Sequence, residues 1–170
     1  MPTEFRFEHT FDAASPAAII AAYFDDDHLA AQDVVAGLRD RQVVESRDDG
    51  TVWTCVWKVA STRPLPSIVR PLVPGGQLTY LETMTWHRPE HRAALTVTPQ
   101  LLGGRVELSG TYQFETHGER QVLRRYAGAV NANVPLLSGK IERTILGEFQ
   151  QQVPALAACT QRWLDARRPA

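Results

Sequence analysis

The sequence has 170 residues, a length typical of one globular domain, and its shares of 44% hydrophobic and 22% charged residues exclude a disordered or fibrous chain. A formal net charge of -1 gives no basic signature, so nucleic acid is not an expected partner. We therefore expect a single domain over residues 1–170.

The sequence shows no targeting signal and no disulfide motif. The stretch from Met1 to Thr10 mixes charged and apolar residues and lacks the continuous apolar run of a secretory signal. No segment reaches the roughly 20 apolar residues that a membrane-spanning helix needs. The two cysteines, Cys55 and Cys159, are far apart and form neither a disulfide framework nor a paired-cysteine motif. We expect a reduced, cytoplasmic protein without a transmembrane segment.

The first part of the chain predicts one strand followed by two short helices. Apolar and polar residues alternate from Phe5 to Phe11, a period typical of a half-buried strand. Ser15 and Pro16 form a typical helix start, with a capping side chain before a proline at the first helical position. The run from Asp25 to His28 is suited to cap a second helix in a solvated junction. It lacks the ligand spacing of a calcium loop, so no metal site is expected.

From about Arg39 the pattern changes to a series of strands joined by short turns, among them the Asp-Gly hairpin signal at Asp49 and Gly50. Because the connections are short, neighbouring strands should pair antiparallel. The predicted strands are Gln42–Ser46, Val52–Ala60, Leu78–His87, Ala93–Pro99, Arg105–Glu115 and Gln121–Val134.

The end of the chain has helical periodicity. Apolar residues recur at steps of three and four from Ile141 to Leu164, which predicts a long amphipathic helix. Pro154 lies inside it, where proline removes a hydrogen bond and clashes with the preceding turn. A kink or break is therefore expected near residues 150–153.

This order of elements resembles the START-like, or SRPBCC, superfamily, and most closely a branch of it known only as a domain of unknown function. The resemblance covers nearly the whole chain. It implies an α+β helix-grip fold, in which a curved antiparallel sheet wraps around a long C-terminal helix and two short helices follow the first strand. The segments that carry it are F-R-F-E-H-T-F at Phe5–Phe11, S-P at Ser15 and Pro16, Y-L-E-T-M-T-W at Tyr80–Trp86 and V-P-L-L-S-G-K-I-E at Val134–Glu142.

The resemblance leaves the function open. The superfamily includes lipid carriers, hormone receptors, polyketide cyclases and aromatases, and oxygenase domains, and membership alone does not select among them. The oxygenase iron site requires a cluster of carboxylates and histidines that this sequence does not contain. We therefore expect neither a metal nor another cofactor.

A cavity wall can be predicted from alternation, which places Tyr80, Glu82 and Met84 on one strand face. We interpret this face as concave and add residues of the same orientation from other elements. The predicted ligand-binding set is Phe5, Phe7, His9, Tyr80, Glu82, Met84, Trp86, Tyr112, Tyr126, Ile145, Phe149 and Val153.

Three polar features in this set have two interpretations each. Glu82 is either an acid or base in an apolar wall, or a carboxylate neutralised by an arginine on a neighbouring strand or placed near a wet rim. His9 is either a pocket acid or base, or a hydrogen-bonded core residue. Arg124 and Arg125 must face opposite sides of their strand, and the inner one could hold a ligand carboxylate or phosphate. Adjacency does not say which arginine is inside.

The segment from Arg63 to Gln77 combines four prolines with five large apolar residues, so it cannot be a regular central strand. It is either a lid beside the cavity mouth or a hydrophobic loop fixed against the sheet. A contact surface in a homodimer is a further interpretation.

We predict that the protein binds or carries a small hydrophobic molecule, lipid-like or polyketide-like, in an internal cavity. One alternative is an enzyme of the cyclase or aromatase type that uses His9, Glu82 and Tyr126 as acid and base. Another is an interaction module that dimerises through residues 63–77.

Overall fold

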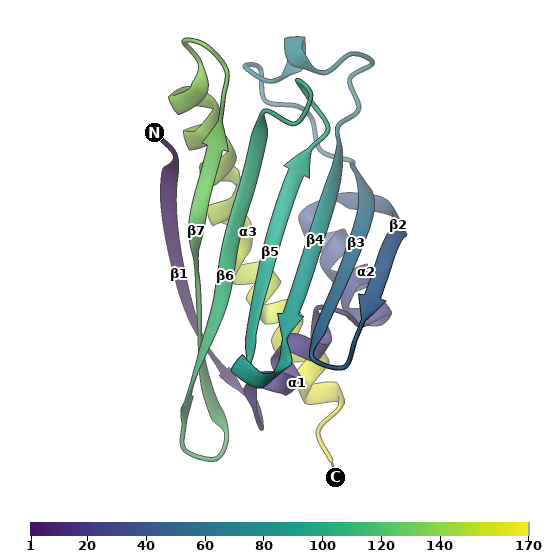
Figure 1. Cartoon of the computed structure of the whole chain (residues 1–170), viewed down its shortest axis with the longest axis vertical. Helices are drawn as coiled ribbons and strands as arrows, with labels where there is room; N and C mark the ends of the chain where they lie inside the picture. Colours follow the sequence, from purple (N-terminus) through teal and green to yellow (C-terminus); the bar gives the residue numbers. More distant parts are fainter. Residues whose placement is uncertain (170) are drawn as a thin grey trace.

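A single seven-stranded antiparallel sheet curves around one long helix in the computed structural model, which describes residues 1–169 (Figure 1). This is the predicted α+β helix-grip fold. The helices are α1 (Pro16–Ala22), α2 (Asp26–Ala36) and α3 (Ser138–Ala166), with short 3-10 turns at Arg70–Leu72 and Arg88–Glu90. The strands are β1 (Thr3–Asp12), β2 (Leu38–Asp48), β3 (Val52–Ser61), β4 (Thr79–His87), β5 (Arg92–Pro99), β6 (Val106–His117) and β7 (Gln121–Ala132).

The sheet has the strand order β1-β7-β6-β5-β4-β3-β2. From β2 to β7 each strand pairs with the next one along the chain, as the short connections require, and β1 closes the arrangement by pairing with β7. Strand β2 begins at Leu38, earlier than the predicted Gln42, and β7 ends at Ala132, before the predicted Val134. Because β1 and β2 are the two edges of the sheet, α1 and α2 cross from one edge to the other.

Side-chain caps fix the two short helices. Ser15 accepts a hydrogen bond from the backbone N–H of Ala18 at the start of α1, and Asp25 accepts one from His28 at the start of α2. The prediction that residues 25–28 form a solvated junction is wrong for His28, whose side chain is buried with 1% of the residue exposed. Its Nε2 lies 2.9 Å from the Oγ1 of Thr160 on α3, so the side chain has a polar partner inside the core.

Helix α3 runs without a break through Pro154, which corrects the expected interruption of the helix. Pro154 lies on the exposed side, where water can solvate the carbonyl group that proline leaves without a partner. Buried residues hold the helix on both sides of it, with Ile141 and Leu146 before and Ala157 after. Tertiary packing of this apolar face outweighs the local cost of one proline.

A buried carboxylate anchors the first turns of α3 to the sheet. Glu142 accepts hydrogen bonds from the hydroxyl of Thr3 on β1 at 2.7 Å and from the backbone N–H of Ala132 at the end of β7 at 2.9 Å. The helix is therefore fixed where β1 and β7 lie side by side, and from there it crosses the concave face (Figure 1).

The segment over residues 63–77 packs its apolar side chains inward. Leu65, Val69 and Val73 are buried together with Val106 and Ile141 in a second hydrophobic cluster at one end of the sheet. This packing agrees with a loop fixed against the sheet. Ile68 and Leu72 of the same segment are half-buried and pack against this cluster.

Candidate functional site

A cavity of about 260 Å³ lies between the concave face of the sheet and α3. Side chains from the sheet, from Tyr23 after α1, from α2, from α3 and from the 63–77 segment line it, and most of them are apolar. Nine of the twelve residues of the predicted ligand-binding set are in this lining. They are Phe7, Tyr80, Glu82, Met84, Tyr112, Tyr126, Ile145, Phe149 and Val153.

The local patterns of two elements explain this agreement. Alternation along β4 points every second side chain from Tyr80 to Met84 toward α3. On α3, steps of four residues bring Ile145, Phe149 and Val153 to the helix face that meets the sheet.

The other three predicted residues lie outside the lining. Phe5 is buried behind it, with its ring centroid 5.4 Å from that of Phe7. Trp86 is at the end of β4, where its ring lies 6.1 Å from Phe24. His9 is half-buried beside the ring of Phe11, and burial lowers the pKa of its imidazole.

Glu82 is held in an ion pair on the cavity wall. Its Oε2 accepts a hydrogen bond from Nη1 of Arg41 at 2.8 Å, and the same guanidinium binds both carboxylate oxygens of Asp33, at 2.6 and 2.9 Å. Burial opposes the charge of Arg41, but the hydrogen bonds that it donates to Asp33 and the negative charge of Glu82 raise its pKa. Glu82 is therefore a carboxylate neutralised by an arginine, but the expectation of a partner on a neighbouring strand is wrong, because Arg41 lies on β2 and β3 separates β2 from β4.

The two neighbouring arginines of β7 have opposite environments. Arg125 faces outward and forms salt bridges with Glu8 at 3.1 Å and Glu115 at 2.8 Å. Arg124 is buried and lines the cavity, where its Nη1 donates a hydrogen bond to the hydroxyl of Tyr23. A signal for this orientation is present in the sequence, because Arg124 shares its strand face with Tyr126.

Three tyrosine rings form a stack beside Arg124. The ring of Tyr112 lies 4.1 Å from that of Tyr126 and 5.1 Å from that of Tyr23. The Arg124 guanidinium carbon is 5.2 Å from the Tyr112 ring and 4.9 Å from the Phe11 ring, so aromatic faces cover the cation. Burial raises the pKa of all three tyrosine hydroxyls, which are therefore neutral near pH 7.

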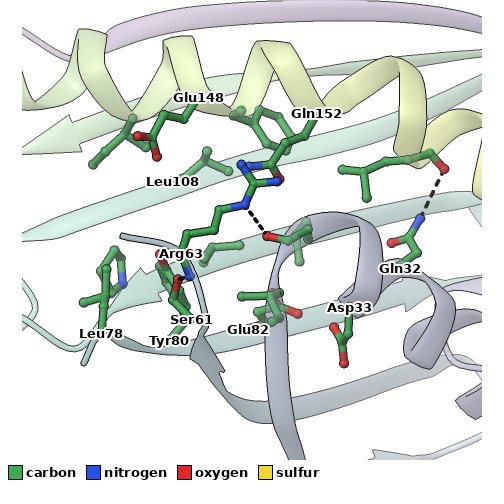
Figure 2. Close-up of a pocket in the computed structure, with 18 of the residues that line it drawn as sticks. Gln32, Asp33, Ser61, Arg63, Leu78, Tyr80, Glu82, Leu108, Glu148 and Gln152 are labelled. Atoms are coloured by element: carbon green, nitrogen blue, oxygen red, sulfur yellow. Dashed lines mark hydrogen bonds between the residues drawn. The ribbon is translucent and has the colours of Figure 1, made fainter. Parts of the chain in front are cut away.

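The exposed members of the lining mark the side on which the cavity opens. Arg63 lies here, and in Figure 2 its side chain extends toward the face of α3 that carries Glu148 and Gln152. Its Nε donates to the carbonyl oxygen of Ala36 at 2.9 Å and its Nη2 to that of Val35 at 3.2 Å. Arg63 thus caps the C-terminal end of α2 at the mouth.

Two kinds of feature are absent from residues 1–169. That part of the chain contains no group of three or more His, Cys, Asp or Glu side chains arranged to hold a metal ion. None of its helices is both long enough and apolar enough to pass through a membrane.

Solved structures of low sequence identity share this fold. TTHA0849 from Thermus thermophilus has a TM-score of 0.62 at 17% identity, covering 98% of this chain and 99% of that chain. The Zhui aromatase/cyclase from Streptomyces sp. R1128 has a TM-score of 0.62 at 14% identity, covering 98% and 97%. A START superfamily protein from Mycobacterium smegmatis has a TM-score of 0.59 at 8% identity, covering 97% and 99%. At these identities the likeness shows the fold alone.

Comparison with curated proteins finds no match. The family model described as a protein of unknown function, DUF2505, matches residues 6–164. Because this match spans nearly the whole sequence, the chain belongs to the DUF2505 family, and its fold is the one seen in START-like structures.

Proposed function

We propose that the protein binds a small, mainly apolar molecule in the cavity between the sheet and α3. The supporting observation is the cavity itself, with its volume of about 260 Å³ and its largely apolar lining. Protein interiors contain few voids larger than one water molecule, whose share of liquid volume is about 30 Å³. An apolar space several times that size is characteristic of a ligand site.

The volume favours a compact ligand. Pockets for small molecules span roughly 300 to 1,000 Å³, and this cavity lies near the lower limit. A ring system or a single short alkyl chain suits it better than a lipid with two acyl chains. The START superfamily protein and the aromatase/cyclase among the similar structures add support through their shared fold.

The acid-base alternative has less support from the geometry. General acid-base catalysis needs its groups within reach of one substrate. His9 does not line the cavity, and Glu82 is occupied by its ion pair with Arg41. Tyr126 lines the cavity and its hydroxyl is neutral, so this group can orient a ligand as readily as protonate one.

Binding of an uncharged apolar probe tests the proposal. N-phenyl-1-naphthylamine should bind the protein saturably, with one site per chain. Leu108→Trp should abolish this binding, because Leu108 lines the cavity and the larger ring would fill it. Leu81→Trp is the matched control, because Leu81 lies on β4 outside the lining. Probe fluorescence gives the affinity and circular dichroism verifies the fold.

Native mass spectrometry should first establish that the purified protein carries no copurified molecule. Failure of such ligand-free, folded protein to bind the probe would contradict the proposal. Equal binding by folded Leu108→Trp and wild-type protein would also contradict it, because the probe would then lie outside the cavity.

A further inference from the structure

Arg124 is a buried cation that has no anionic partner among residues 1–169. Its side chain lines the cavity, and the residue is 8% exposed. Within residues 1–169 its one hydrogen bond goes to the neutral hydroxyl of Tyr23, and its Nε is buried with no acceptor. A charge removed from water is costly unless an opposite charge or several hydrogen bonds compensate it.

No group of residues 1–169 places a negative charge in direct contact with the Arg124 guanidinium. The rings of Tyr112 and Phe11 cover the guanidinium, and burial keeps the tyrosine hydroxyls protonated. The carboxylates of Asp33 and Glu82, which also line the cavity, are engaged with Arg41. Glu148 lines it from an exposed position on α3.

Arg41 shows how an arginine of this cavity binds a carboxylate. The edge of its guanidinium that carries Nε and Nη2 donates two hydrogen bonds to the two oxygens of Asp33. The same edge of Arg124 has no carboxylate on it, since Nη1 makes its one hydrogen bond and Nε makes none. Tyr126 shares its strand face with Arg124, and its hydroxyl is a second buried donor that has no partner among residues 1–169.

We propose that the ligand of this cavity is an organic acid whose carboxylate pairs with Arg124 while its apolar body fills the remaining space. The inference rests on the proposed function and narrows its ligand class. A carboxylate brings one negative charge, which suits one buried guanidinium that no carboxylate of residues 1–169 contacts. A phosphate monoester carries close to two charges at neutral pH and would leave one of them buried without compensation.

Matched ligand pairs test this in the wild-type protein. Naphthalene-2-carboxylate should bind about tenfold or more tightly than naphthalene-2-carboxamide at pH 7, because the pair differs mainly in the charge that Arg124 would meet. Decanoate and decanamide form the corresponding alkyl pair and distinguish an aromatic from a fatty-acid ligand. Isothermal titration calorimetry gives the four affinities.

Variants then assign the preference to one residue. Arg124→Met should remove the preference for the acid over the amide, measured as the ratio of the two affinities in the same variant. Arg124→Lys keeps the charge without the fork of donors and should retain part of the preference. Arg125→Met is the matched control, because this neighbouring arginine faces outward, and its acid-to-amide ratio should equal that of wild type.

The possible failures can be told apart. Equal affinity for acid and amide, in wild-type protein that still binds N-phenyl-1-naphthylamine, would overturn the inference that the ligand is a carboxylate. The proposal that the cavity binds an apolar molecule would then still hold. Absence of binding by the uncharged probe would overturn the cavity function itself. Should Arg124→Met fail to fold, Arg124→Lys and Tyr126→Phe replace it, and an unchanged acid-to-amide ratio in both would overturn the assignment.

Discussion

His28 is an imidazole enclosed where α1, α2 and α3 meet. Its ring lies 5.9 Å from that of Tyr23 and 6.0 Å from that of Trp163, and its Nε2 has Thr160 as a partner. Burial lowers the pKa of this histidine to about 4, against the opposing effect of Asp25. The folded protein therefore keeps His28 neutral at pH values at which the unfolded chain protonates it.

This difference in proton binding predicts acid sensitivity. Because the folded-state pKa is lower than the ordinary value of 6.5, the contribution of His28 to stability is complete above pH 6.5 and is lost as the pH falls toward 4. The loss should reach about 3 kcal/mol at pH 4. In His28→Gln the free energy of unfolding should change correspondingly less between pH 7 and pH 4, as measured by urea titration.

His117→Gln is the control for this experiment, because His117 is exposed on β6 and its replacement should leave the acid sensitivity intact. A wild-type pH dependence in folded His28→Gln would contradict the role assigned to the buried imidazole.

At the scale of elements, β6 and β7 approach each other unusually closely at a pair of glycines. Gly110 and Gly128 are opposite each other in the antiparallel register. A Cβ atom on Gly128 would overlap the carbonyl oxygen of Ser109 and the Cα atom of Gly110, both of which are backbone atoms. The ring of Tyr126 lies across Gly110, so the same contact also positions one wall of the cavity.

Gly128→Ala should therefore destabilise the protein by about 1 to 3 kcal/mol or more, because the two strands must separate to admit the methyl group. Gly147→Ala on α3 is a matched control, since its new Cβ would meet no atom within 4 Å. It should instead stabilise the protein by about 0.5 to 1 kcal/mol, because alanine favours the helix. Urea denaturation measures both changes, and equal effects of the two substitutions would refute the close approach.

Over the whole molecule, packing differs between the closely packed core around Phe11 and the region around the cavity. Phe11 is completely buried among core residues, whereas Phe149 is partly exposed to the cavity and contacts aromatic neighbours on one side. Its ring centroid lies 5.5 Å from that of Phe7 and 6.0 Å from that of Tyr126.

The same substitution should consequently have different costs at these two positions. Phe11→Ala should destabilise by about 3 to 5 kcal/mol, the usual loss at a packed core site. Phe149→Ala should cost less, because its cavity side has fewer packed atoms to lose. It should also enlarge the site and improve binding of bulkier uncharged probes. Equal losses of unfolding free energy in Phe11→Ala and Phe149→Ala would indicate that the cavity region is as densely packed as the core around Phe11.

The elements that could be predicted from sequence are those with an undisturbed period. Alternation along β4 and steps of three and four along α3 predicted the strand, the helix and the residues that each contributes to the wall. The same reasoning gave the orientation of Trp86 but not its position along the strand, which lies beyond the cavity. Periodicity specifies the face of an element on which a side chain lies. How far that side chain lies from the cavity depends on how all the strands of the sheet are arranged.

The charged part of the wall could not be predicted in the same way. Arg41 lies on β2, whose pairing with β3 shifts register between Arg39 and Gln42, so alternation no longer assigns its side chain to a face. Its partners come from α2 and from β4, and contacts between such distant segments leave no local pattern. The orientation of Arg124 could be predicted, because β7 is regular and alternation places Arg124 on the same face as Val122 and Tyr126.

The pairing of β1 with β7 has a consequence for how the chain folds. Thr3 pairs with Val130 and Asp12 with Gln121, so the first strand finds its only partner strand after more than a hundred intervening residues. Contacts of such long sequence separation slow folding, because a large loop must close before they form. During synthesis β1 stays unpaired until β7 has been made, and its apolar side chains Phe5 and Phe11 stay exposed to solvent until then. The cavity, which needs β7 and α3 as walls, is therefore completed late in folding, and its ligand can stabilise only that final state.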